Sequence, residues 1–224
     1  MGLDMYLNRM PRYKEVTANQ ISAIENWFDY EERPSKYKKD TFKEWCGCNE
    51  TDLPNKETIE YFRPFYVTRY SDWDIKHEYG HKSIMEDVGY WRKANQIHNW
   101  FVERAQDGID DCGYHHEVTE EMLELLRSTC EAVIKASKLI NGKIENGYTF
   151  DKNGNRIYNY EDGLIIEDPS VAEKLLPTIS GFFFGGTSYD EYYIEDLKDT
   201  IEIIDKVLEE TDFDTQMIYY RSSW

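Results

Sequence analysis

The sequence has few cysteines, no long apolar run and too little positive charge to balance its acids. Four cysteines occur in 224 residues, and a chain of this length can bury a core without disulfides, so we interpret them as reduced thiols of a cytosolic protein. No apolar run approaches the ~20 residues that cross a membrane, and the N-terminus lacks the apolar segment of a secretory signal. The sequence therefore predicts a protein without membrane contact.

Acidic residues outnumber basic ones, and their excess lies in the second half of the chain. The 44 Asp and Glu residues against 26 Lys and Arg residues give a formal net charge of −18. Residues 101–224 carry −16 of this charge, and residues 1–100 carry −2. An acidic surface repels a phosphate backbone and attracts basic proteins, so we expect no direct nucleic-acid binding. The alternative is that the excess charge serves only solubility.

Strand-like alternation and helical periodicity are mixed along the chain without a regular strand–helix–strand rhythm. Strands are expected at 3–7, 88–92 and 217–220, and helices at 17–34, 94–106, 119–140 and 188–210. This order predicts the α+β class, with a mixed or largely antiparallel sheet, helices packed on it and a single domain over 1–224. Asn153-Gly154 between two aromatic-rich segments predicts a β-hairpin excursion near 145–160.

Local signals mark several helix starts. Capping boxes are expected at 17–20, 170–173 and 188–191, where a Ser or Thr precedes a Gln or Glu by three residues. The three consecutive phenylalanines at 182–184 predict a buried strand before the last of these helices. Gly185-Gly186 follows, without the lysine of a phosphate-binding loop, so we interpret this turn as structural.

One cluster of polar and aromatic residues lies at the junction of the strand at 88–92 with the next helix. An aromatic face for stacking, cations for phosphate and an amide for a base edge make it a candidate nucleotide or small-molecule site. The alternative is that the rings belong to the core and the cations pair with acids. The candidate ligand-binding residues are Trp91, Arg92, Lys93, Asn95 and His98.

A second candidate site is the acidic helix near the C-terminus. Residues 189–214 contain 11 acids and two lysines. Like charges four residues apart destabilise a helix slightly, so a basic partner is one reason to keep them, and spaced carboxylates can imitate phosphates. The alternative is an ordinary solvated face. The candidate partner-binding residues are Asp190, Glu191, Glu195, Asp199, Glu202, Asp205 and Glu209.

Other groupings give weak signals. Cys46-x-Cys48 is short-spaced for a zinc site, and nothing in the sequence brings it together with Cys112-x-x-His115-His116. The segment at 151–162 lacks the glycine and glutamate of a calcium loop. The acids at 107, 110 and 111 lie beside these histidines in a segment typical of turns. No nucleophile is flanked by recognisable catalytic partners. We therefore expect no metal and no cofactor, and we favour a protein that is not an enzyme.

Several segments carry a resemblance. These are MGLDMYL at 1–7, GYWRKANQIH at 89–98, SGFFFG at 180–185 with YDEYY at 189–193, and YYRSSW at 219–224. Together they resemble a family of uncharacterised phage and prophage proteins with no assigned activity. The resemblance implies synthesis in the cytoplasm of a bacterial host.

These observations give two hypotheses of different kinds. The first is an acidic accessory or counter-defence protein that engages a basic host protein through the C-terminal half, as a nucleic-acid mimic. The alternative is a nucleotide or small-molecule binding protein, or an enzyme, that uses the 90–98 cluster. A structural component of the virion is a third hypothesis. The sequence does not indicate the oligomeric state.

Overall fold

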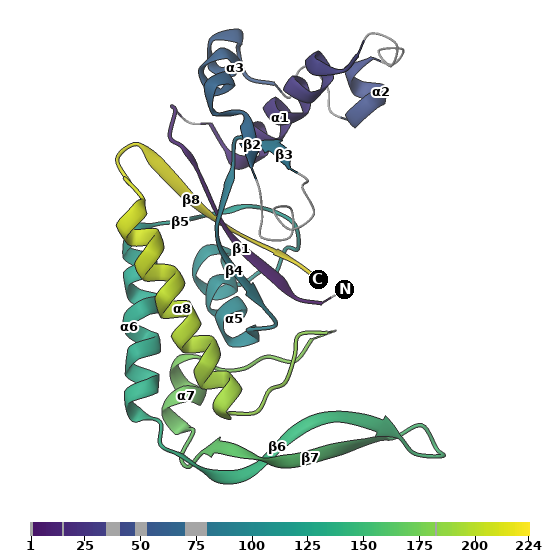
Figure 1. Ribbon diagram of the computed structural model, residues 1–224, viewed down its shortest axis with the longest axis vertical. Coiled ribbons are helices and arrows are strands. Elements are labelled where there is room, and N and C mark those ends of the chain that lie inside the picture. The colour runs from purple at the N-terminus through teal and green to yellow at the C-terminus, as the bar shows by residue number, and fades with distance from the viewer. Residues whose placement is uncertain (1, 15, 35–40, 48–52, 70–79, 182) are drawn as a thin grey trace.

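The computed structural model describes residues 2–14, 16–34, 41–47, 53–69, 80–181 and 183–224 (Figure 1). Its antiparallel sheets with helices packed against them confirm the predicted α+β class. In chain order the elements are β1 (Asp4–Pro11), α1 (Ala18–Glu32), α2 (Phe42–Cys46), α3 (Lys56–Phe62), a 3-10 turn (Arg63–Phe65), β2 (Val67–Arg69), β3 (His81–Ser83), β4 (Glu86–Arg92), α5 (Asn95–Ala105), β5 (His116–Val118), α6 (Glu120–Ala136), β6 (Leu139–Phe150), β7 (Arg156–Ile166), α7 (Ser170–Leu175), α8 (Glu191–Glu210) and β8 (Gln216–Ser223).

The central sheet has four strands in the order β4-β1-β8-β5, and all neighbours run antiparallel. β1 and β8 pair from Asp4↔Ser223 to Pro11↔Gln216, so the two ends of the described chain meet in the middle of the sheet (Figure 1). The strands predicted at 3–7, 88–92 and 217–220 are confirmed as β1, β4 and β8, with longer bounds.

One face of this sheet carries the main hydrophobic core together with α5, α6 and α8. The alternate β1 residues Leu3, Met5 and Leu7 are fully buried there, as the two-residue period of a strand requires. The Phe101 ring of α5 stacks on the Tyr220 ring of β8 with centroids 4.1 Å apart. This packing fixes which face of each strand is turned toward the helices.

Helix α8 lies directly against β4 because Gly89 has no side chain. A Cβ atom at Gly89 would come within 2.7 Å of Ile203 Cγ2 on α8 and 3.3 Å of Leu7 Cβ. Two residues further along β4, the indole Nε1 of the buried Trp91 donates a 2.9 Å hydrogen bond to Thr200 Oγ1. These contacts determine which α8 side chains lie along the strand.

A second hydrophobic cluster lies at the other end of the sheet, among α1, α3 and the ends of β1 and β8. Its buried members include Ile21, Ile24 and Phe28 of α1 and Met217 of β8. The predicted helix at 17–34 is confirmed as α1. In Figure 1 these N-terminal helices form a separate layer above the sheet.

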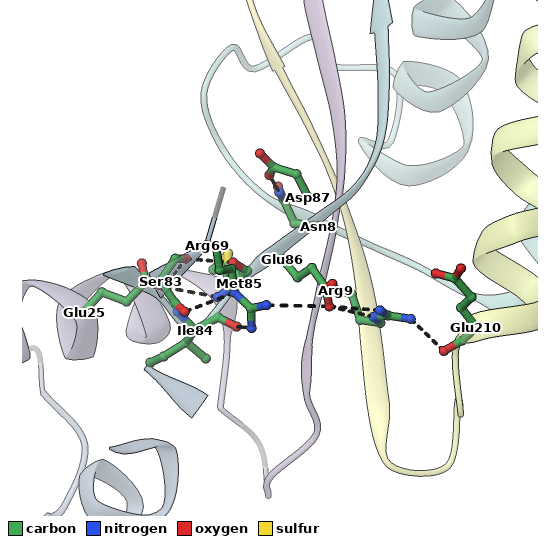
Figure 2. Close-up of polar contacts among 10 residues, drawn as sticks. All are labelled: Asn8, Arg9, Glu25, Arg69, Ser83, Ile84, Met85, Glu86, Asp87 and Glu210. Carbon is green, nitrogen blue, oxygen red and sulfur yellow. Dashed lines mark hydrogen bonds and ion pairs between the residues drawn. The ribbon is translucent and has the colours of Figure 1, made fainter. Parts of the chain in front are cut away.

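Polar contacts connect this N-terminal part to the sheet and to α8 (Figure 2). Glu25 on α1 accepts a 2.8 Å hydrogen bond from Ser83 Oγ. Arg9 on β1 donates to Glu86 Oε2 at 2.9 Å and to the last carbonyl of α8 at 2.6 Å, and Arg69 Nη1 lies 3.8 Å from the same Glu86 oxygen. Arg9 and Arg69 also line a cavity of about 230 Å³. Because Glu86 pairs with both arginines, we interpret this network as structural.

Strands β6 and β7 form a hairpin that projects from the body of the molecule (Figure 1). They pair from Leu139↔Ile166 to Phe150↔Arg156, which confirms the predicted hairpin and extends it in both directions. At the predicted turn, Gly154 has φ +84°, a conformation that favours glycine.

The helix predicted at 119–140 is wrong at its C-terminal end. α6 ends at Ala136, and residues from Leu139 belong to β6. Ser137 leaves the helix with extended dihedral angles (φ −87°, ψ 125°), and its hydroxyl donates a 2.8 Å hydrogen bond to the Val133 carbonyl. Ile140 continues the apolar spacing of the helix by coincidence, because strand residues also alternate into a core.

Only the first of the three capping boxes is confirmed. Thr17 Oγ1 accepts from the Gln20 N–H, and Gln20 Oε1 accepts from the Thr17 N–H. At α7 no side chain caps the helix, and α8 is capped by Asp190, so the boxes at 170–173 and 188–191 are wrong. The strand predicted at 182–184 is also wrong for Phe183 and Phe184, which lie in a loop, whereas residue 182 is outside the described residues.

We expect Gly89→Ala to lower the free energy of unfolding by about 1–3 kcal/mol, because the new methyl group would overlap Ile203. Combining it with Ile203→Ala should cost less than the sum of the two single losses, since the overlap is then relieved. Urea denaturation measures both effects. Gly186→Ala is the control: its Cβ would meet nothing, so a change within about 0.5 kcal/mol is expected. Equal losses at both glycines would contradict the close-approach explanation.

Candidate functional site: an acidic groove between β4 and α8

Three of the five predicted ligand-binding residues are buried in the main core. Trp91 is 4% exposed, Asn95 1% and His98 0%. The His98 ring bridges two groups, with Nδ1 2.7 Å from the Tyr220 hydroxyl and Nε2 3.2 Å from Asp110 Oδ2. Burial lowers the pKa of His98, and the Asp110 carboxylate opposes this shift. These side chains bind other parts of the protein, and little of their surface remains for a ligand.

Asn95 holds the loop that precedes α8 against the start of α5. Its Nδ2 donates to the carbonyls of Phe184 (3.2 Å) and Gly186 (2.7 Å). Its Oδ1 accepts a 2.9 Å hydrogen bond from the Ile179 N–H. The amide would have to release this loop before it could bind the edge of a base, so its geometry favours the structural alternative.

The remaining two residues, Arg92 and Lys93, are exposed at the end of β4. Lys93 has φ +64°, and its N–H donates 2.8 Å to the Leu3 carbonyl, which ends the pairing of β4 with β1. Of the five predicted residues, Trp91 and Arg92 line a groove with α8, and the other three lie outside its lining.

The predicted partner-binding residues fall into two groups on α8. Asp190 caps the helix by accepting from the N–H groups of Tyr192 and Tyr193, and Glu191 Oε1 accepts from the Leu164 N–H at 2.9 Å. Asp205 pairs with Arg127 of α6. The other four are exposed and, among the described residues, form no ion pair; they are Glu195, Asp199, Glu202 and Glu209.

A groove of about 440 Å³ runs between α8 and the edge strand β4. We call it the acidic groove. One wall is α8 and the other is the end of β4, where Gly89 packs against Ile203 of the helix. Its lining residues are Tyr90, Trp91, Arg92, Asp196, Asp199, Glu202 and Ile203.

Asp196 is the groove residue that the sequence analysis missed. It is half-buried, and its Oδ2 accepts a 2.9 Å hydrogen bond from Gln96 Nε2 of α5. Burial raises the pKa of the Asp196 carboxyl from its ordinary 3.8 to about 6. The hydrogen bond from Gln96 opposes the shift, and the charges of Asp199, Asp190 and Glu195 add to it. A carboxyl with a raised pKa in a cleft is a candidate functional group.

The sequence did contain a signal for Asp196. Tyr193, Thr200 and Val207 are buried at seven-residue intervals along α8, and Asp196 lies on the same side of the helix, three residues after Tyr193. A carboxylate in such a row is expected to border the core. The row is hard to recognise beforehand because Tyr193 and Thr200 are also common on helix surfaces.

The other candidate groupings give no site. Among the described residues, no three His, Cys, Asp or Glu side chains are arranged to hold a metal ion. The Cys46 thiol on α2 donates a 3.2 Å hydrogen bond to the Phe42 carbonyl, and residue 48 lies outside the described part of the chain. Asp111 Oδ1 lies 2.6 Å from His116 Nε2, and Asp151 accepts from the N–H groups of Asn153 and Asn155 within the hairpin turn. In the parts of the chain that the structure describes, no helix is long and apolar enough to cross a membrane.

We expect Asp196→Asn to raise the free energy of unfolding by about 1–3 kcal/mol at pH 8. Because the folded pKa lies above the unfolded value, ionising Asp196 costs stability as the pH rises from about 4 to about 6, and the full cost persists above that range. The gain should therefore disappear below about pH 4. Denaturant titrations between pH 3.5 and 8 test this dependence.

Glu209→Gln is the matched control, because it removes an exposed charge from the same helix outside the groove. Its effect should stay within about 0.5 kcal/mol at every pH. If Asp196→Asn destabilised the protein at pH 8, the carboxylate would be contributing to the fold, and the cost inferred from its burial would be wrong.

Comparison with known proteins adds no assignment to this geometry. No protein-family model, no curated protein and no solved structure matches the chain significantly, so the resemblance to phage proteins stays a prediction.

Proposed function

We propose that this is a non-enzymatic binding protein that engages a basic surface of another protein through the carboxylates of α8. The observation that carries the proposal is the row of Asp196, Asp199 and Glu202 along the acidic groove, continued on the helix surface by Glu195. Among the described residues, Asp199, Glu202 and Glu195 have no ion-pair partner, so their charge is available to a second molecule.

The spacing of these charges supports mimicry of a nucleic acid. Residues 195–202 span about 10.5 Å of helix, at ~1.5 Å per residue. Four carboxylates over this length give one charge about every 3.5 Å, close to the ~3.4 Å per charge of one DNA strand. A protein surface that binds a phosphate backbone would find a similar density of negative charge on α8.

Two lysines moderate this field without removing it. Lys198 and Lys206 are exposed on α8, and neither forms an ion pair with a described residue. The net charge of α8 remains −6, and that of the whole chain −18. Such a field accelerates encounters with a basic partner and weakens as salt increases.

The half-buried Asp196 is a second argument for function. Its ionised form costs stability at neutral pH, as its raised pKa indicates. An asparagine would accept the same hydrogen bond from Gln96 without the charge. A costly charge in a groove favours a binding role over a purely solubilising one.

The biological setting rests on the resemblance to phage and prophage proteins alone. With it, the partner would be a basic nucleic-acid-binding protein of a bacterial host, and the protein would be an accessory or counter-defence factor in the host cytoplasm. The nucleotide-binding hypothesis has less support, because Trp91, Asn95 and His98 are buried and the acidic groove repels phosphate.

The test compares two triple variants with the same change in net charge. The first neutralises α8 by Glu195→Gln, Asp199→Asn and Glu202→Gln. The control neutralises exposed acids on α5, α6 and β6 by Glu103→Gln, Glu124→Gln and Glu145→Gln. Each immobilised protein is used to capture proteins from a bacterial lysate at 50 and 300 mM salt. Each captured protein is then purified and bound to labelled duplex DNA, and the wild type and both variants are tested for their ability to displace the DNA from it.

We expect the wild type and the control to capture a basic DNA-binding protein at low salt and to displace DNA from it. The α8 variant should bind that protein at least ten times more weakly. Losing three close charges should remove at least ~1.4 kcal/mol of binding free energy, which corresponds to a tenfold change in Kd. Equal binding by both triple variants, or capture that does not respond to salt, would rule out the proposed role of α8.

A further inference from the structure

We propose that the partner contributes an extended, basic segment that pairs with the outer edge of β4 as an additional antiparallel or parallel strand in the acidic groove. This inference rests on the proposed function and specifies the kind of segment that the site accepts. It depends on three features: the direction of the β4 backbone groups, the regular geometry of the edge, and the charge of the opposite wall.

Within the described ranges, no hydrogen bond uses the backbone groups of Tyr90 and Arg92 on the outer side of β4. The Lys93 N–H points to β1, because it donates to the Leu3 carbonyl at 2.8 Å. Backbone groups alternate in direction along a strand, so Gly89 and Trp91 also point to β1. Tyr90 and Arg92, which lie between them, direct their N–H and C=O groups to the outer side. Among the described residues, β4 has a strand on one side only.

The open stretch is short and regular. The register between β1 and β4 is shifted between Leu7 and Asn8, so the irregularity lies opposite the first half of β4. From Gly89 to Arg92 the pairing is continuous. Natural edge strands are commonly protected by proline, charged side chains or a bulge. This stretch contains no proline and no bulge, and its one charged residue is the exposed Arg92 at its end.

The other wall of the groove determines what can bind to this edge. Asp196, Asp199 and Glu202 face it from α8, held there by the Gly89–Ile203 contact and the Trp91–Thr200 hydrogen bond. A neutral or acidic strand would bury or oppose these carboxylates, whereas lysine or arginine side chains would pair with them. The groove thus selects basic segments and rejects others.

The two faces of an added strand would meet different surroundings. Every second side chain of the added strand would point toward α8, and such side chains are ~6.8 Å apart. The carboxylates of residues 196 to 202 are spread over ~9 Å of helix, so two of these side chains could reach them. On the opposite face they would lie beside Tyr90, which is 48% exposed and whose ring centroid is 5.3 Å from that of Tyr6. The expected segment therefore alternates basic residues with apolar or aromatic ones.

A defined probe tests this pairing. It is a nine-residue peptide that alternates lysine with valine and carries a fluorophore at its N-terminus. Two further peptides have the same sequence with N-methyl groups on alternate residues, one on the odd positions and the other on the even positions. The methyl groups remove backbone hydrogen-bond donors and keep every charge. Fluorescence anisotropy at 50 mM salt measures binding, and residue-resolved amide hydrogen exchange locates it on the protein.

We expect the unmodified peptide to bind and one of the two methylated forms to bind at least ten times more weakly. In the free protein the amides of Tyr90 and Arg92 should exchange faster than those of Gly89, Trp91 and Lys93. Binding of the unmodified peptide should slow exchange at Tyr90 and Arg92 by at least tenfold. On the protein side, Tyr90→Pro should weaken binding tenfold relative to Tyr90→Val, since both lose the phenol ring and only the first loses the N–H.

The possible failures separate this inference from the proposed function. If the peptide binds but neither N-methylation nor exchange at Tyr90 and Arg92 shows an effect, strand addition is wrong, and the charge-based function is unaffected. If the peptide does not bind, strand addition is also wrong, and capture by the α8 variant still decides the proposed function. If Tyr90→Pro unfolds the protein, the exchange measurement on the wild type remains decisive.

Discussion

The contact between Gly89 and Ile203 is the constraint on which the candidate site depends. Any larger residue at position 89 would meet Ile203 Cγ2 within 2.7 Å, so the Ile203 side chain or α8 itself would have to shift. With the helix in place, Trp91 reaches Thr200, and the α8 residues one turn to either side of Thr200 border the strand. Because Gly89 has no side chain, α8 can pack close to β4, and its row of carboxylates then lies beside the edge strand of the sheet.

Much of the fold could be predicted because its signals are local. The alternation in β1 and β8, the spacing of α1 and the Asn153-Gly154 turn each depend on residues close in sequence, and each prediction was confirmed. The errors arose where a local pattern fits two structures. Ile140 suits a helix or a strand, and Ser188 resembles a cap although Asp190, two residues later, binds the free N–H groups.

The candidate site was harder to predict because it depends on distant pairs. The sequence identified Trp91 and the acids of α8 separately, but nothing local indicates that residue 89 packs on residue 203. The same limitation explains why His98 was considered for a ligand: its partners Tyr220 and Asp110 become neighbours only when β8 closes the sheet. Residue type indicated which side chains could bind a ligand or a partner, and burial determines whether each of them faces the core or the solvent.

The charge on α8 gives one explanation for two properties of this edge. An unprotected strand tends to pair with other copies of itself, yet two copies of this protein would each bring Asp196, Asp199 and Glu202 to the contact. Their mutual repulsion would protect the edge from Gly89 to Arg92, which has neither a proline nor a bulge. In the complex that we propose, the same carboxylates would attract a basic segment, which would neutralise them while it pairs with the strand. On the same proposal, a basic side chain that pairs with Asp196 would offset the stability that burial of its ionised carboxylate costs the isolated protein.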